Sequence, residues 1–261
     1  MRWAMQVYRC YMRISFSSAA AYRADFFFSL FISLLSHLLV PLLTALIYMN
    51  GASIPGWTFA EALTVQAVFM LCAGVCAPLF GSMVWIAMQH IREGTYDLIL
   101  LKPGPAAFLT ASAAFNVGDA GMLLGGLAMF VFALFRLPDL PGSAEFLRFG
   151  LLFLAGLCMN LGCILLMTAT AFKWVGNGRI YEIYDAITMF GRYPAAVFPR
   201  ALQGLSAYLV PVAMMGYFPA AAVMGRADPR MYFACLPCGL FLLAGCFAFN
   251  RMIRAYQSAG G

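Results

Sequence analysis

The chain has 261 residues, of which 64% are hydrophobic and only 10% are charged, and its formal net charge is +6. A soluble domain carries about 25% charged residues, so this composition excludes a water-soluble globule of this size. Long apolar runs without polar alternation favour membrane helices over a β-barrel. The basic residues are spread over several helix ends, which favours anionic lipid headgroups over nucleic acid as the partner.

Residues 2–23 carry a narrow polar stripe. Arg2, Gln6, Arg9 and Arg13 recur every three or four residues and share one face of a helix, whereas the other face is apolar. Such a helix lies in the headgroup layer of a membrane and does not cross it. The arginines also interrupt any apolar stretch of a signal peptide, so we expect none here.

Five long apolar segments follow, separated by charges or turn residues. Each is long enough to cross about 30 Å of hydrocarbon as a helix. The five ranges are residues 26–48, 63–88, 106–134, 146–172 and 231–253. Pro78 lies inside the second range, between Gly74 and Gly81, and predicts a kink there.

Residues 180–225 hold four prolines and are too long for one simple span. Two layouts fit. In the first, residues 180–198 cross the membrane and residues 200–225 re-enter it as a broken hairpin. In the second, residues 180–198 lie at the interface and residues 201–225 cross. Both give six membrane-spanning helices in an all-α integral membrane protein. The prolines indicate either a lined pathway or a kinked structural helix.

The distribution of lysine and arginine predicts the orientation. With the N-terminus inside, cytoplasmic segments hold ten of the 16 basic residues and outer loops hold four, with Arg192 and Arg200 unassigned. This bias places both termini in the cytoplasm.

Catalytic and cofactor signatures are missing from the sequence. It has no P-loop motif, no Cys or His cluster with metal-ligand spacing, and no Ser–His arrangement suited to hydrolysis. We therefore expect no enzyme activity and no cofactor on this chain. His37, in the middle of the first span, is either a pathway residue or a packed, hydrogen-bonded histidine.

Ionisable residues within the apolar segments are candidates for a transport pathway. Glu182, Asp185 and Arg192 are the candidates here, and Asp119 is a further one. The alternative is that the three acidic residues lie at the wet cytoplasmic edge of the membrane, where charges are inexpensive.

Residues 91–103, IREGTYDLILLKP, form a compact charged segment between the second and third spans. Thr95 is placed to cap a short helix that ends before Pro103. The segment is either an interfacial loop whose charged side chains extend to the membrane surface or a cytoplasmic coupling helix. We expect the coupling helix, in which Leu98 and Leu101 enter a groove on a soluble partner. The residues expected to contribute are Arg92, Glu93, Asp97, Leu98, Leu101, Lys102 and Pro103.

These features resemble the ABC-2 type permeases of ABC transporters. Residues 94–103, GTYDLILLKP, fit the G-x-x-D-x-x-L-x-K-P element of one branch at every position. Three later stretches are similar to further motifs of that branch: FGRYPAAVFPRAL, LVPVAMMGYFPA and RAYQSAGG. The resemblance covers residues 1–261. It implies one domain with the type V exporter-like fold, in which a re-entrant pair follows the fifth span, as in the first layout.

The resemblance also implies a function. Such permeases reside in the bacterial cytoplasmic membrane as homodimers or as heterodimers with a sister permease. A separate ATPase dimer binds ATP and Mg²⁺ and docks on the coupling helices, and an amphipathic drug, lipid or saccharide-like substrate moves outward by alternating access. The alternatives left by the sequence are an ATP-independent secondary carrier and a non-transporting membrane scaffold.

Overall fold

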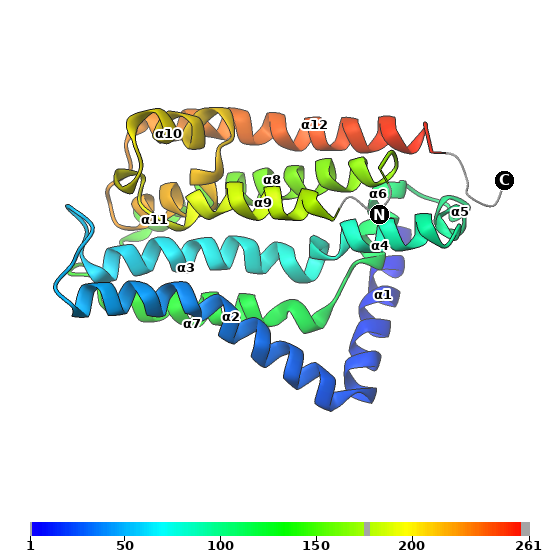
Figure 1. Cartoon of the computed structure of the whole chain (residues 1–261), viewed down its shortest axis with the longest axis horizontal. Coiled ribbons are helices and arrows are strands. Elements are labelled where there is room, and N and C mark those ends of the chain that lie inside the picture. The colour runs from blue at the N-terminus through cyan, green and yellow to red at the C-terminus, as the bar shows by residue number, and fades with distance from the viewer. Residues whose placement is uncertain (1, 175–177, 257–261) are drawn as a thin grey trace.

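The computed structural model describes residues 2–174 and 178–256. The expected domain, residues 1–261, and the last five residues of the tail motif RAYQSAGG therefore extend beyond the described residues. Helices and turns make up the described ranges, and no strand occurs within them. The long helices lie side by side along one axis (Figure 1). The all-helical class expected from the sequence is confirmed.

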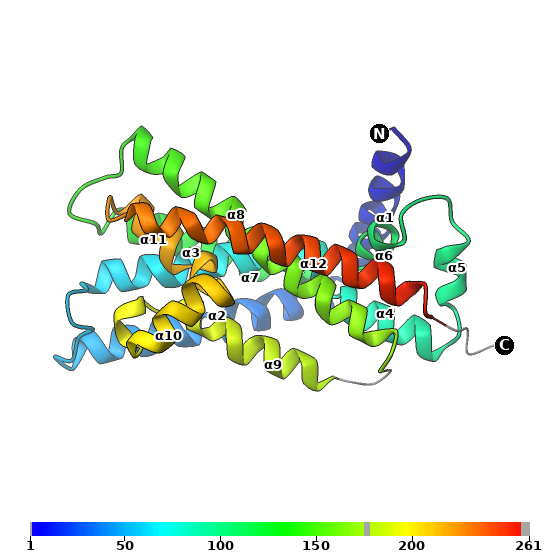
Figure 2. The same cartoon turned by 90° about the horizontal axis from the view of Figure 1, so that it is seen from above.

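Helix α1 (Arg2–Ala21) lies across the bundle, at the end where α5 also lies (Figures 1 and 2). None of its residues is buried. Helix α2 (Arg23–Met49) follows after one residue and runs to the opposite end. A helix lying across the end of a bundle of apolar helices has the geometry of a helix in the membrane interface.

The second apolar segment is a bent rod at the centre of the bundle. Helix α3 (Phe59–Cys76) is buried along nearly its whole length, a π-helical turn occupies Ala77–Gly81, and α4 (Met83–Arg92) completes the segment. Pro78 is the second residue of the π turn, so the structure interrupts the regular helix where the kink was expected. At the start of α3, Thr58 and Glu61 form a capping box.

The third apolar segment is broken, and the expectation of one helix over residues 106–134 is wrong. The structure divides this range into α6 (Ala106–Ala113), a 3-10 turn (Val117–Asp119) and α7 (Ala120–Leu134). The backbone N–H of Asn116 donates to the carbonyl of Pro78, and its side chain accepts from the N–H of Gly118. These bonds hold Asn116 in an extended conformation and stop the helix.

Helices α8 (Ser143–Ala171) and α12 (Cys235–Ile253) form one of the two most extensive helix pairs, and α3 with α7 forms the other. Both pairs approach closely through glycines. A Cβ atom on Gly162 of α8 would lie 2.6 Å from the carbonyl carbon of Phe241, and one on Gly126 of α7 would lie 2.8 Å from the backbone nitrogen of Leu71. Small residues therefore set the helix spacing within this one chain.

The proline-rich segment contains many short helical pieces. Helix α9 (Arg179–Thr188) lies beside α8, and α10 (Arg200–Gly204) and α11 (Tyr217–Val223) lie towards the end opposite α5 (Figure 1). Short turns connect them, and a 3-10 turn (Pro229–Ala234) leads into α12. The connecting turns are Met189–Arg192, Ala195–Val197, Leu205–Leu209 and Val212–Met215.

The buried part of this segment packs into the bundle. Residues 218–223 of α11 are all buried, and α11 packs against α8 and α3. Arg226, just beyond α11, pairs with the buried Glu61, and its guanidinium lies 5.5 Å from the ring centre of Trp57. These contacts fix the end of α11 to the start of α3.

Five segments in the described ranges are long and apolar enough to cross a membrane. They are Arg23–Met49, Phe59–Arg92, Val117–Leu134, Ser143–Ala171 and Pro229–Ile253. They coincide with the five apolar segments expected from the sequence, except that the third begins later. Neither range expected for the sixth span, residues 180–198 or residues 201–225, is among them, because both ranges are divided into short helical pieces.

Candidate functional site

Helix α5 (Tyr96–Leu100) projects from one end of the bundle (Figure 2). It has a buried side and an exposed side. Tyr96 and Ile99 are buried, whereas Leu98 is 61% exposed and Leu101, just after the helix, is 79% exposed. Two neighbouring exposed leucines on a fixed helical turn are the kind of apolar surface that docks into a partner.

Tyr96 attaches α5 to the body of the protein. Its hydroxyl lies 2.8 Å from Thr110 Oγ1, and its ring makes edge contacts with Phe172 and Tyr256. Burial raises the pKa of Tyr96 to about 12, which is the expected direction for a phenol whose charged form would lose its hydration. The sequence analysis did not single out Tyr96, although its spacing of three from Ile99 places both on one helix face.

We expect Tyr96→Phe to lower the free energy of unfolding by about 1 kcal/mol at pH 7, because one buried hydrogen bond is lost. The raised pKa means that the folded state holds the tyrosine proton more tightly than the unfolded chain, where the pKa is near 10. The stability that Tyr96 adds relative to phenylalanine is therefore complete below pH 10 and is lost as the pH rises through 12. Thermal melts of both proteins between pH 7 and 12 test this, and a stability difference that stays constant would contradict it.

The N-terminus of α5 differs from the expected one. Thr95 precedes α5 but makes no capping hydrogen bond to it, so the predicted cap is wrong. Its backbone is in a helical conformation, and its Oγ1 lies 2.7 Å from His90 Nδ1 instead. Gly94 takes a positive φ of 66°, which turns the chain sharply enough for this contact with α4.

Two charged residues of the loop contact the neighbouring helices α4 and α1. Gln89 Nε2 donates to Glu93 Oε1 at 3.0 Å, and Lys102 Nζ donates to the hydroxyl of Tyr11 on α1 at 2.9 Å. Arg92 is exposed, and Asp97 lies in the first turn of α5. Pro103 follows the helix end and is exposed. All seven expected residues thus lie in or next to this one loop, and Lys102 connects it to α1.

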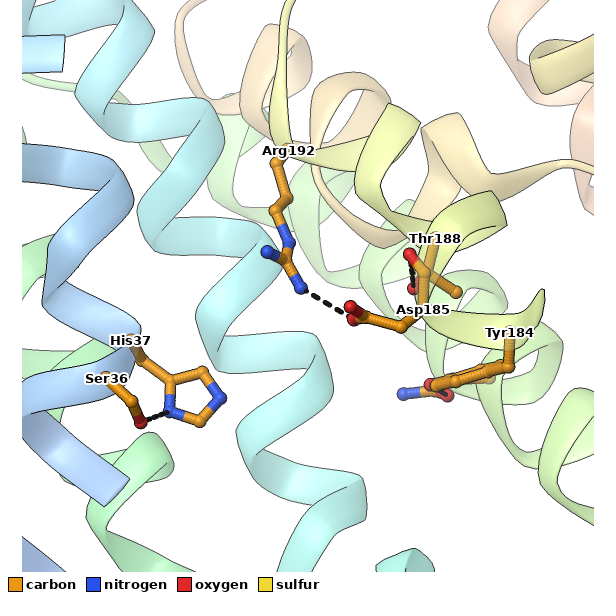
Figure 3. A network of polar contacts seen from close by, with 7 residues as sticks. Ser36, His37, Tyr184, Asp185, Thr188 and Arg192 are labelled. Atoms are coloured by element: carbon orange, nitrogen blue, oxygen red, sulfur yellow. Dashed lines mark hydrogen bonds and ion pairs between the residues drawn. The ribbon is translucent and has the colours of Figure 1, made fainter. Parts of the chain in front are cut away.

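A second polar group of residues lies between α2 and α9 (Figure 3). Asp185 and Arg192 form an ion pair at 3.1 Å, and the Arg192 guanidinium lies 5.0 Å from the ring centre of Phe69 on α3. Beside them, the hydroxyl of Tyr184 donates to Asn160 Oδ1 at 2.6 Å. The ring of His37 faces this group from α2.

Two recesses adjoin this group, with volumes of about 110 and 220 Å³. His37, Asp185 and Arg192 line both of them, together with apolar residues of α3 and α7. Glu182 lines neither recess and is exposed. The structure therefore brings together two of the three candidate pathway residues and His37, but not Glu182.

Comparison with protein families gave a match over most of the chain. Residues 34–260 match the model of the ABC-2 family transporter protein. The chain belongs to this family. No curated protein and no solved structure is significantly similar to it.

In this ABC-2 family chain, the polar group adjoins a helix that is suited to cross a membrane. His37 is near the middle of α2, itself one of the five segments suited to cross a membrane. Ionisable side chains at this depth avoid lipid and face protein or a water-filled cavity. The Asp185 side chain is largely exposed in this single chain.

Proposed function

We propose that this ABC-2 family chain is the permease subunit of an ATP-driven exporter. A separate ATPase dimer docks on the coupling helix, residues 91–103. The observation that carries the proposal is the construction of α5: Leu98 and Leu101 face outwards while Tyr96 and Ile99 fix the helix to the bundle. A rigidly attached apolar projection can transmit a partner's motion, whereas a loose loop cannot.

The roles of the loop residues follow from their chemistry. Leu98 and Leu101 fill a groove on the ATPase, and Glu93, Asp97 and Lys102 orient the helix through polar contacts. Arg92 and Pro103 flank it. ATP and Mg²⁺ bind to the partner, since the sequence of this chain has no P-loop.

The proposed orientation places the α5 end of the bundle in the cytoplasm. The lysine and arginine bias supports it, and α1, with Arg2, Arg9 and Arg13, lies at the same end. The arginines of α1 then contact anionic lipid headgroups of the bacterial cytoplasmic membrane. Both termini are cytoplasmic in this arrangement.

The proposed assembly is a dimer of this permease with a second copy or a sister permease. The α2–α9 side exposes many large apolar side chains beside the Asp185–Arg192 pair, and a second permease would cover both. The chain then has six spans in the type V arrangement. Helix α9 begins the fifth, and residues 200–225 re-enter the membrane from the outer side as a proline-broken segment.

In the proposed mechanism, ATP closes the ATPase dimer and displaces the two coupling helices. The displacement reaches the bundle through Tyr96 and Ile99, because these side chains are packed against it. The interface between the two permeases then opens outwards and releases an amphipathic substrate. This is alternating access driven from a separate chain.

Extraction in a mild detergent tests the proposal. The tagged wild-type protein is purified and all bound proteins are identified by mass spectrometry. We expect a nucleotide-binding subunit to co-purify with it. Purification without any ATPase from gently solubilised membranes would remove the main support for the exporter.

A further inference from the structure

The larger recess, of about 220 Å³, contains hydrogen-bonding atoms that the fold leaves unused. Gln66, on α3, is only 3% exposed, and its Oε1 has no partner among the described residues. The Nε atom of Arg192 is likewise buried and unpaired. Buried polar atoms in native proteins are nearly always paired, so two such atoms on residues that line one recess point to a ligand.

The direction of the Gln66 amide follows from its neighbours. The hydroxyl of Thr44 donates to the carbonyl of Val40, so its oxygen accepts from Gln66 Nε2 at 2.7 Å. The other end of the amide is therefore the oxygen. Gln66 offers the recess a hydrogen-bond acceptor.

His37 offers a second acceptor. Its Nδ1 lies 2.6 Å from the carbonyl oxygen of Ser33, which can only accept, so Nδ1 carries the proton. In the neutral ring, Nε2 is then unprotonated and accepts. Figure 3 shows the ring turned towards the side of Asp185 and Arg192.

The recess thus presents acceptors on Gln66, His37 and Asp185 and a donor on Arg192, whose charge is balanced by Asp185. An ammonium group has no lone pair for Arg192 and is repelled by it. A carboxylate or phosphate has no hydrogen for Gln66 or His37 and is repelled by Asp185. A hydroxyl group both donates and accepts, so neutral hydroxyls fit all four residues.

We propose that this recess binds the neutral, hydroxyl-bearing polar end of an amphipathic substrate, such as a sugar ring. The inference rests on the proposed export function and names its substrate class. The recess is below the ~300 Å³ of a drug-sized site, so it holds the polar end alone. The apolar residues Val40, Pro41 and Met70 line the same recess, and exposed leucines on α2 provide a surface for the hydrocarbon chain.

Three probes with the same eight-carbon alkyl chain test the proposal: octyl glucoside, octylammonium and nonanoate. Binding is measured by equilibrium dialysis below micellar concentrations, with the purified permease and any ATPase bound to it in phosphatidylcholine nanodiscs. The signal of empty nanodiscs is subtracted. We expect saturable binding of octyl glucoside at least tenfold tighter than that of either charged probe.

Two variants remove one acceptor each. We expect Gln66→Leu and His37→Leu to weaken octyl glucoside binding about tenfold each, the effect of one buried hydrogen bond. Leu39→Ala serves as the control, because Leu39 is 56% exposed on α2 and does not line the recess. His37 is only partly buried, so its variant remains informative if Gln66→Leu does not fold.

The proposal is overturned if a charged probe binds as tightly as octyl glucoside, if no saturable binding exceeds that of empty nanodiscs, or if both variants bind like the wild type. Co-purification of an ATPase is recorded for every preparation. An ATPase without sugar binding rejects this site alone. Sugar binding without an ATPase supports the site and rejects the exporter.

Discussion

Replacing Leu98 and Leu101 together by aspartate is expected to abolish co-purification of the ATPase and, with it, ATP-dependent transport. Each leucine is exposed, so the substitutions leave the membrane bundle folded. Burying one leucine side chain contributes about 1.5–3 kcal/mol, and two carboxylates in an apolar groove add a desolvation cost. We expect a loss of at least a hundredfold in affinity. Quantitative mass spectrometry of the purified variant measures the ATPase that remains.

Leu140→Asp is the matched control for this pair. Leu140 is 70% exposed in the loop between α7 and α8, at the end of the bundle away from α5. The control is expected to retain the ATPase and to elute like the wild type in size-exclusion chromatography. Retention of the ATPase by the double variant, or equal loss from the control, would show that docking does not occur through α5.

Gly162→Ala is expected to cause a large loss of stability. The added Cβ would lie 2.6 Å from the carbonyl carbon of Phe241 and 2.7 Å from the backbone nitrogen of Leu242. These are backbone atoms of α12, which cannot rotate away, so the two helices must separate. Overpacking of this kind costs about 1–3 kcal/mol. A thermal melt in detergent is expected to show a clearly lowered midpoint.

Gly150→Ala provides a control on the same helix, α8. A Cβ at Gly150 meets nothing within 4 Å, and alanine favours a helix over glycine by roughly 0.5–1 kcal/mol. The control is therefore expected to melt at or above the wild-type temperature. Equal midpoints for the two alanine variants would be inconsistent with the close α8–α12 packing described here.

The membrane class and most of the architecture could be predicted from the sequence, because they depend on local composition. Apolar length alone located the five long segments, and Pro78 alone located the kink in the second. The break between α6 and α7 could not be predicted in this way. It depends on a hydrogen bond from Asn116 to Pro78, whose positions are brought together only by packing.

The candidate site, like the fold, could be predicted from the sequence only in part. The loop of residues 91–103 could be recognised from its charge and its motif. Its attachment through Tyr96 depends on Thr110, Phe172 and Tyr256, which come from three other parts of the chain. Gln66 was missed for a similar reason, since a glutamine in an apolar run gives no sign of which of its atoms stays unpaired.

The most direct test of the central claim is a photocross-link from position 98. A photoreactive amino acid replaces Leu98, the cells are irradiated before lysis, and the cross-linked products are identified by mass spectrometry. Docking of an ATPase on α5 predicts a covalent adduct with a subunit that carries a P-loop. Adducts with lipids or with outer-membrane and periplasmic proteins alone would contradict it.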